Sequence, residues 1–264
     1  MAGIPVAGIP VLVTRPEGQA RELGERLAAS GFEPIYAPLM AIEAFPEPST
    51  EQRQLLLDLC HFEHVIFVSR NAIRHGMAWI EDYWPQLPVG IHWYTVGSSS
   101  AAALAKYGLE VLQPTGDMTS EGLLALPQLA AVSGQRVMIV KGEGGRQQLR
   151  ETLQARGARV EELEVYRRAL PAYGPGELAE RIRSGQVRVV LLSSGEALDN
   201  MVSLLDAAGQ ARARECVLVA PGARVAAAAA RAGFTRVLEA RNATDDAMLA
   251  ALATLREELQ PAPG

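Results

Sequence analysis

The residues best suited to chemistry in this sequence follow its short, β-branched apolar runs. Hydroxyls, glycines and cations dominate these positions, and acids are almost absent: Thr14, Arg15 and Pro16; Ser69, Arg70 and Asn71; Gly97, Ser98, Ser99 and Ser100; Thr115, Gly116 and Thr119; Lys141, Gly142 and Arg146; Ser193, Ser194 and Gly195; Pro221, Gly222 and Arg224. Hydroxyls and backbone N–H groups hydrogen-bond carboxylate or phosphate oxygens, and arginine adds bidentate bonds. The set predicts a site for a polyanion. The alternative for any one serine or threonine is an ordinary helix cap.

The apolar runs before these groups predict buried parallel strands. They cover residues 11–14, 65–68, 92–96, 109–113, 137–140, 159–165, 188–192, 217–220 and 236–239, and nearly all are apolar on both faces. Helical stretches at 19–29, 98–106, 145–156 and 224–231 lie among them, each followed by a glycine suited to ending a helix. The pattern predicts an α/β protein with helices on both faces of parallel sheets. Ligands of such sheets bind beyond the carboxyl ends of the strands, where the polar groups fall.

A fixed offset indicates that the chain contains two copies of one α/β unit. Shifting by 125 residues relates Ser69 to Ser194, Gly97 to Gly222 and Gly108 to Gly233, without a gap from 69 to 249. A shift of 126 relates "VLVTR" at 11–15 to "VMIVK" at 137–141. The alternative is that any two βα units share such spacing. Two proline-rich, extended segments, 33–50 and 164–176, interrupt the pattern and are expected to cross between domains.

Several classes of function are disfavoured. "KGEGGRQQ" at 141–148 matches neither a dinucleotide nor a P-loop fingerprint, and "VGSSSA" at 96–101 lacks the closing glycine of a serine hydrolase elbow. The four histidines follow no metal-binding spacing, so no metal is predicted, and His61 and His64 are expected on the surface. A net charge of −5 argues against nucleic acid or an anionic membrane as partner.

The cysteines and the beginning of the sequence favour the cytoplasm. Cys60 and Cys216 are too few for a disulfide framework and are expected to be buried thiols. "MAGIPVAGIPVLV" at 1–13 fits neither a signal peptide nor a spanning helix.

In the order and spacing of its motifs, the chain resembles the uroporphyrinogen-III synthase family, over essentially its whole length. The resemblance rests on "VLVTRP" at 11–16, "VIFVSRNAI" at 65–73, "YTVGSSSAAALAKYGLEV" at 94–111, "SEGLLAL" at 120–126, "VMIVKGEGGRQQLRETLQARGARVEELEVYRR" at 137–168 and "VVLLSSGEALDNM" at 189–201. It implies two flavodoxin-like domains joined by a two-stranded antiparallel linker, with the active-site cleft between them. One domain would be discontinuous, 1–37 with 169–264, and the other would be 38–168. The duplicated units would then begin and end at other residues than the domains do.

The resemblance also implies a reaction. The family closes hydroxymethylbilane, an open-chain tetrapyrrole with eight carboxylates, to uroporphyrinogen III, with loss of water and inversion of the last pyrrole ring. It uses no cofactor, and catalysis would consist of holding the bilane in shape and donating a proton to the leaving hydroxyl. The protein is expected to act as a monomer.

Four hydroxyl positions are assigned through the resemblance. Tyr166 in "EVYRR" matches the tyrosine of the family's cleft and could donate the proton, while Ser69, Ser100 and Ser194 would bind carboxylates. The position related to Ser100 in the second copy is Val225, which departs from the family pattern. The remaining substrate-binding predictions rest on strand-end placement alone: Arg15, Arg70, Ser98, Ser99, Lys141, Gly142, Arg146, Ser193, Gly222 and Arg224.

Two other interpretations stay open. A two-domain module that binds a polyanion without changing it would have the same architecture. A phosphosugar or nucleotide enzyme is a third interpretation, disfavoured by the lack of acidic metal ligands at the strand ends.

Overall fold

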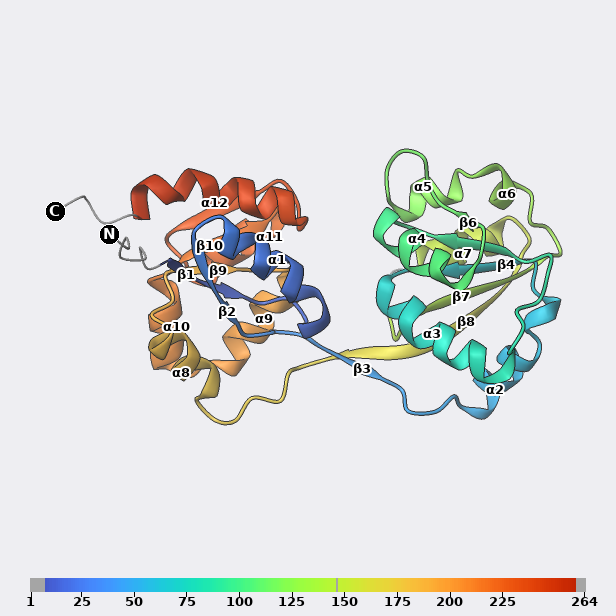
Figure 1. Ribbon diagram of the computed structural model, residues 1–264, viewed down its shortest axis with the longest axis horizontal. Helices are drawn as coiled ribbons and strands as arrows, with labels where there is room; N and C mark the ends of the chain where they lie inside the picture. The colour runs from blue at the N-terminus through green and yellow to red at the C-terminus, as the bar shows by residue number, and fades with distance from the viewer. Residues whose placement is uncertain (1–7, 146, 260–264) are drawn as a thin grey trace, which may run out of the picture. The chain divides into compact units, whose positions relative to one another are not determined.

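The computed structural model describes residues 8–145 and 147–259 and divides the chain into two compact units (Figure 1). Unit 1 combines Met1–Ala41 with Ala169–Gly264, and unit 2 is Ile42–Arg168. The chain therefore enters unit 2 from unit 1 and returns to it. That the domains predicted from the sequence fold independently stays a prediction.

Unit 1 has a five-stranded parallel sheet in the order β11-β10-β9-β1-β2. The strands are β1 (Ile9–Val13), β2 (Phe32–Tyr36), β9 (Val189–Leu191), β10 (Val217–Pro221) and β11 (Val237–Ala240). The helices are α1 (Glu17–Ala29), α8 (Glu177–Ser184), α9 (Gly195–Leu204), α10 (Ala207–Arg214), α11 (Ala223–Arg231) and α12 (Asp245–Leu259). Numbered within the unit, the strand order is 2-1-3-4-5, which is that of a flavodoxin-like sheet.

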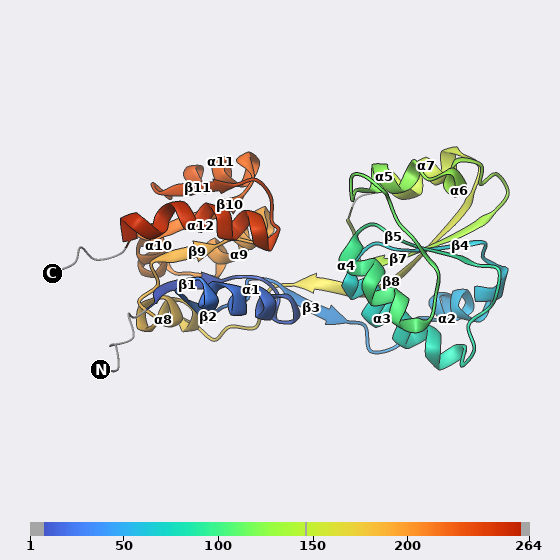
Figure 2. The ribbon, with the colours of Figure 1, turned by 45° about the horizontal axis from the view of Figure 1, so that its top comes forward.

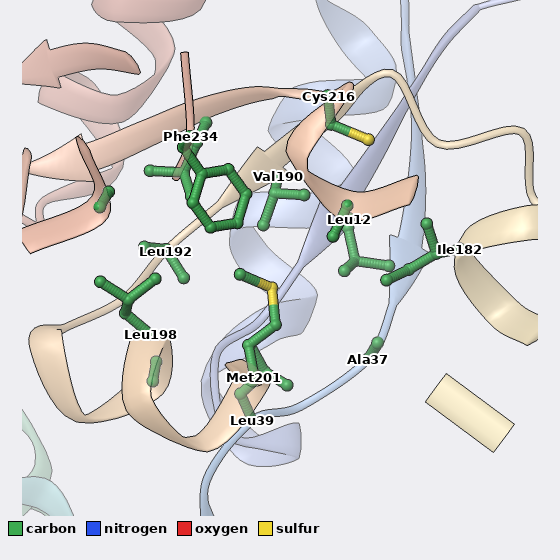
Figure 3. Close-up of a cluster of buried hydrophobic side chains, with 14 of the residues drawn as sticks. Leu12, Ala37, Leu39, Ile182, Val190, Leu192, Leu198, Met201, Cys216 and Phe234 are labelled. Atoms are coloured by element: carbon green, nitrogen blue, oxygen red, sulfur yellow. The ribbon is translucent and has the colours of Figure 1, made fainter. Parts of the chain in front are cut away.

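Alternating side chains of the strands build one core on each face of this sheet. Leu12 points into the face covered by α8, α9, α10 and α11, where it lies near Val190, Met201 and Phe234 (Figure 3). Its neighbours Val11 and Val13 point to the opposite face, which α1 and α12 cover. Apolar residues on both faces are therefore required, as the sequence pattern predicted.

Unit 2 has a six-stranded sheet in the order β3-β8-β7-β4-β5-β6. Its strands are β3 (Ala41–Ala44), β4 (His64–Phe67), β5 (His92–Thr95), β6 (Val111–Leu112), β7 (Arg136–Gly142) and β8 (Arg159–Ala169), and β4 to β8 pair in parallel. The helices are α2 (Thr50–Leu57), α3 (Arg70–Tyr83), α4 (Ser98–Leu104), α5 (Ser120–Leu124), α6 (Pro127–Ala130) and α7 (Gln148–Ala155), with 3-10 turns at Leu59–His61 and Ala105–Tyr107. Helices α2, α3 and α4 cover one face of the sheet and α5, α6 and α7 cover the other (Figure 2), and the buried side chains of each group belong to one core.

The strand orders of the two sheets confirm that the chain contains two copies of one α/β unit, and the two copies begin at different strands. The offset relates β7 to β1, β8 to β2, β4 to β9, β5 to β10 and β6 to β11, and related strands occupy the same place in their sheets. In unit 2, however, the strands related to β1 and β2 come last in the chain. One unit is thus a circular permutation of the other, as the resemblance implied.

The two proline-rich segments contain regular structure. The chain passes between the units within both segments, after Ala41 and after Arg168, and residues 33–50 also include most of β2 and all of β3. Strand β3 lies next to β8 in the sheet of unit 2, and the chain passes between the units along these two strands. Their predicted antiparallel direction stays a prediction.

Three smaller expectations have clear outcomes. All four glycines expected to end helices, at positions 31, 108, 157 and 233, have positive φ. The expected surface position of His64 is wrong, because the residue is only 2% exposed. Cys216 is buried as expected, whereas Cys60 is exposed. Among the described residues, no helix has both the length and the apolar content needed to cross a bilayer.

Candidate active site

The sharpest polar arrangement in unit 2 joins Tyr166 to Ser69. The Tyr166 hydroxyl lies 3.2 Å from the Ser69 hydroxyl, although the residues are 97 positions apart. Ser69 follows β4 and caps α3, accepting the Ala72 N–H at 3.1 Å. Tyr166 belongs to β8 and is 8% exposed. The predicted catalytic residue and a predicted carboxylate-binding serine therefore meet at the carboxyl edge of the sheet.

A β-bulge decides which way Tyr166 points. Lys141 of β7 pairs with Glu164 and Gly142 pairs with Tyr166, so the register skips Val165. Successive residues of a regular strand point to opposite faces, yet Val165 and Tyr166 both pack into the core under α3. The bulge turns the tyrosine away from the face of Lys141 and toward Ser69.

Gly142 lies directly against the tyrosine ring. A Cβ atom at this position would stand 2.5 Å from Cε2 and 2.6 Å from Cζ of Tyr166. His75 of α3 is another neighbour of the ring, with 6.1 Å between ring centroids. Burial, followed by the charge of Arg74, lowers the pKa of His75, which favours its neutral form.

The serines of the 97–100 group lie at the beginning of α4. Ser98 and Ser99 are exposed, whereas Ser100 is 7% exposed and faces the core beneath the helix. Backbone N–H groups of Ser100 and Ala101 donate to Gly97 O. This group supplies exposed hydroxyls at Ser98 and Ser99 and a shielded one at Ser100.

Among the predicted cations of unit 2, Lys141 is neutralised and Arg70 is not. Lys141 is 5% exposed, and its Nζ donates to Glu162 Oε1 at 2.9 Å, with Glu164 Oε1 at 3.9 Å. The Arg70 guanidinium is exposed and makes no hydrogen bond or ion pair to another described residue. Arg70 is therefore available to an incoming carboxylate, whereas Lys141 would first have to leave Glu162. Arg146 lies outside the described residues.

The matching edge of unit 1 repeats the serine cap but not the tyrosine. Ser194 caps α9 and accepts the Ala197 N–H at 3.1 Å, the same distance as in the Ser69 cap. Ser193 precedes it and is half-buried. Position 40, which the 126-residue offset relates to Tyr166, is Met40. The hydroxyl pair is therefore specific to unit 2.

At the beginning of α11, the backbone of Gly222 and the positively charged side chain of Arg224 are both accessible to an anion. Gly222 has φ 87° and ψ 161°, a conformation that favours glycine, and an added Cβ would meet nothing within 4 Å. Arg224 is exposed, and its Nη1 lies 3.9 Å from the place of a Cβ on Gly195. Val225, the residue related to Ser100, is buried in the core.

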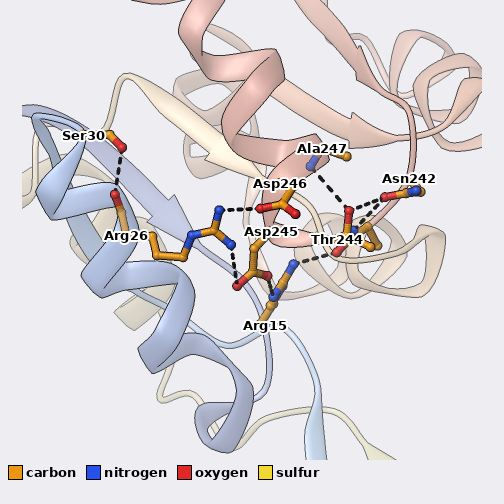
Figure 4. A network of polar contacts seen from close by, with 9 residues as sticks. Arg15, Arg26, Ser30, Asn242, Thr244, Asp245, Asp246 and Ala247 are labelled. Atoms are coloured by element: carbon orange, nitrogen blue, oxygen red, sulfur yellow. Dashed lines mark hydrogen bonds and ion pairs between the residues drawn. The ribbon is translucent and has the colours of Figure 1, made fainter. Parts of the chain in front are cut away.

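Arg15 is occupied by a network at the beginning of α12 (Figure 4). Its guanidinium pairs with Asp245 and donates to Ala243 O at 2.6 Å. Arg26 of α1 pairs with Asp246, and Asp245 lies 3.9 Å from Arg26 as well. The carboxylates of Asp245 and Asp246 thus pair with Arg15 and Arg26, and these ion pairs link α12 to α1 and to the end of β1. Its predicted substrate contact stays a prediction and would require Asp245 to release it.

Relatives of known family match nearly the whole chain. A model of uroporphyrinogen-III synthase HemD matches residues 21–250. The uroporphyrinogen-III synthase of Escherichia coli K12 is 32% identical over 92% of this chain and 99% of its own length. That of Salmonella typhimurium LT2 is 33% identical over the same shares of both chains. This chain belongs to the uroporphyrinogen-III synthase family.

Solved structures of the family show the same fold. The uroporphyrinogen-III synthetase of Helicobacter pylori 26695 has a TM-score of 0.62 at 13% identity, covering 94% of this chain and all of its own. A mutant uroporphyrinogen III synthase from the extremely thermophilic bacterium Thermus thermophilus has a TM-score of 0.56 at 19% identity, covering 95% and 100%. The predicted class, a lyase of tetrapyrrole biosynthesis with a two-domain α/β fold, is confirmed at the level of the family.

Sequence reasoning missed several neighbours of the candidate site residues. It did not single out His75 or the acids that hold Lys141 and Arg15. For His75 the offset carried a signal: the related residue is Asn200, whose Nδ2 donates to Leu39 O at 2.7 Å. The polar residue six positions after each serine cap thus contacts β8 in unit 2 and the segment after β2 in unit 1. Among the described residues, no three or more His, Cys, Asp and Glu side chains are grouped so that they could hold a metal ion.

Proposed function

We propose that this chain catalyses the uroporphyrinogen-III synthase reaction: it cyclises hydroxymethylbilane to uroporphyrinogen III, with loss of water and inversion of the last pyrrole ring. Membership of the family supports this proposal. The observation that carries it in this molecule is the contact between the hydroxyl of the buried Tyr166 and Ser69 at the end of β4. This place is the topological switch point of the sheet, between β7 and β4, where ligands of such folds bind.

The hydrogen bonds around Ser69 favour Tyr166 as the proton donor. Ser69 Oγ accepts the Ala72 N–H, and its own O–H can donate to the tyrosine oxygen. The Tyr166 proton is then free to face the substrate. When the terminal C–O bond of the bilane breaks, the departing hydroxyl takes this proton and leaves as water, and the carbon becomes electrophilic toward the last pyrrole. The remaining catalysis is control of substrate shape.

The substrate carboxylates would be bound by groups at the carboxyl edges of both sheets. Of the predicted cations that the structure describes, Arg70 and Arg224 are exposed and make no ion pair with another described residue, and Ser98, Ser99, Ser193 and Ser194 offer hydroxyls. Gly222 offers backbone at the beginning of α11. Because Arg15 and Lys141 are already paired with acids, we assign the first contacts to Arg70 and Arg224.

The proposal includes the setting of the reaction. The enzyme would act without a cofactor, as a monomer in the cytoplasm, and without nucleic acid or membrane as partner. Its net charge of −5 disfavours a nucleic-acid partner, and the two cysteines are both free thiols.

The test is an isomer assay with freshly generated hydroxymethylbilane. Products are oxidised and the type I and type III uroporphyrins are separated. We expect mainly type III, and we expect Tyr166→Phe to lower kcat at least tenfold. Type I alone, at the rate seen without protein, would refute the proposal and favour the alternative of a binding module for a polyanion. Retention of substrate on the protein, measured by gel filtration, would identify that module.

A further inference from the structure

We propose that Gly142 is a positioning residue, whose missing side chain makes room for the Tyr166 ring and so allows its hydroxyl to reach Ser69. This inference rests on the proposed function, because it assigns how the catalytic tyrosine is held. The sequence alone predicted a substrate contact for Gly142 through its place at a strand end. Its surroundings point instead to the tyrosine.

The bulge sets the direction of the Tyr166 side chain. In a regular β8, the side chain would share a face with Glu162 and Glu164, which bind Lys141 on the side of α7. The bulge at Lys141 and Gly142 shifts the register by one residue and sends Tyr166 to the face of α3. Gly142 is the residue directly opposite Tyr166 after this shift.

The Tyr166 ring occupies the space that a side chain at position 142 would need. A Cβ on Gly142 would approach Cε2 at 2.5 Å, Cζ at 2.6 Å and Oη at 3.0 Å. These atoms form the hydroxyl end of the ring, so any movement that relieves the contact also moves the hydroxyl. Tyr166 is buried and has Ser69 and His75 as further neighbours, which restricts where its ring can go.

The backbone at Gly142 does not itself require glycine. Gly142 lies within β7, and it is absent from the residues with positive φ. Alanine is therefore compatible with the backbone there, and the cost of Gly142→Ala comes from the contact with the ring. At Gly18 of α1, by contrast, an added Cβ meets nothing within 4 Å.

The experiment compares Gly142→Ala, Tyr166→Phe, the double variant and the control Gly18→Ala in the isomer assay. We expect Gly142→Ala to lower kcat at least tenfold while KM changes less than threefold, because the proton donor is displaced and the carboxylate contacts remain. The double variant should be no slower than Tyr166→Phe, and Gly18→Ala should have the wild-type rate. Wild-type kcat for Gly142→Ala, or losses that multiply in the double variant, would overturn the inference.

A second measurement is independent of activity. Tyr166→Ala removes the ring, so Gly142→Ala should lower the urea midpoint of unit 2 in the wild-type chain and leave it unchanged in the Tyr166→Ala chain. If Gly142→Ala alone does not fold, folding of the double variant with Tyr166→Ala still supports the inference. Equal losses in both chains, or failure of both to fold, would overturn it. An inactive wild-type chain that shows this coupling would refute the proposed function and leave the placement of the ring intact.

Discussion

The Ser69–Tyr166 contact can be measured as a free energy, because the molecule contains its own reference. Ser69 and Ser194 cap related helices with the same 3.1 Å bond and nearly the same backbone angles, φ −162° and −167°. Only Ser69 also touches a tyrosine hydroxyl. Replacing each serine by alanine removes one cap from each unit, and from unit 2 it also removes the contact with Tyr166.

The expected magnitudes follow from these contacts. Losing a serine cap costs about 1 kcal/mol of unfolding free energy. A hydroxyl–hydroxyl bond contributes about 0.5–1.5 kcal/mol in addition. We therefore expect Ser69→Ala to destabilise unit 2 by about 2 kcal/mol, and Ser194→Ala to destabilise unit 1 by about 1 kcal/mol. In a Tyr166→Phe chain, which lacks the hydroxyl at position 166, Ser69→Ala should cost only about 1 kcal/mol.

The assay uses the position of the tryptophans. All three, Trp79, Trp84 and Trp93, lie in unit 2, so tryptophan fluorescence during urea unfolding reports that unit, while circular dichroism reports both. The difference between the costs of Ser69→Ala in the two backgrounds is the coupling energy, expected to be about 1 kcal/mol. A coupling below about 0.3 kcal/mol would refute the reasoning, since independent sites add within that margin.

Three further predictions concern other parts of the molecule. Burial raises the pKa of the Cys216 thiol, so a thiol reagent should label only the exposed Cys60 in the native protein and both cysteines in urea; two labels on the native chain would contradict this. Burial also lowers the pKa of His64, so the unfolded chain binds more protons than the folded chain, and unit 2 should lose stability as the pH falls below about 6.5. In urea unfolding followed by tryptophan fluorescence, His64→Gln should make the stability of unit 2 depend less on pH, whereas His61→Gln, at an exposed position, should leave this dependence unchanged. Leu12→Ala in the core of unit 1 should cost about 2–5 kcal/mol in the circular dichroism transition and leave the fluorescence transition in place, whereas movement of both would contradict independently folding domains.

The parallel strands could be predicted because burial on both faces makes them apolar throughout. Strand β2 was missed because Pro34 interrupts "FEPIY", and proline normally argues against a central strand. Among the described strands, β2 lies at the edge of its sheet and pairs with β1, and an edge tolerates proline. The 126-residue offset already related it to the predicted strand 159–165, so the internal repeat was the better guide.

The polar partners could not be predicted, because they depend on contacts between distant residues. Arg15 meets Asp245 across 230 residues of chain, and no local pattern links the two. His64 is buried because its ring nitrogens pair with Tyr94 Oη at 2.9 Å and Gln135 Oε1 at 2.8 Å, two groups on other strands or turns. The direction in which the bulge turns Tyr166 depends on the register between β7 and β8, which residue types alone do not give. Spacing therefore located the strand ends, while the folded structure decided which polar groups are free.

The difference between the two copies bears directly on the role of Gly142. Related positions keep the serine cap in both units, Ser69 and Ser194, because both helices need it. The tyrosine is present in one unit only, and the residue related to Gly142 in the other is Pro16. Glycine thus stands where the ring must be accommodated, and a residue with a side chain stands where there is no ring. The scaffold was duplicated as a whole, but the open space and the hydroxyl that it holds occur together in one copy.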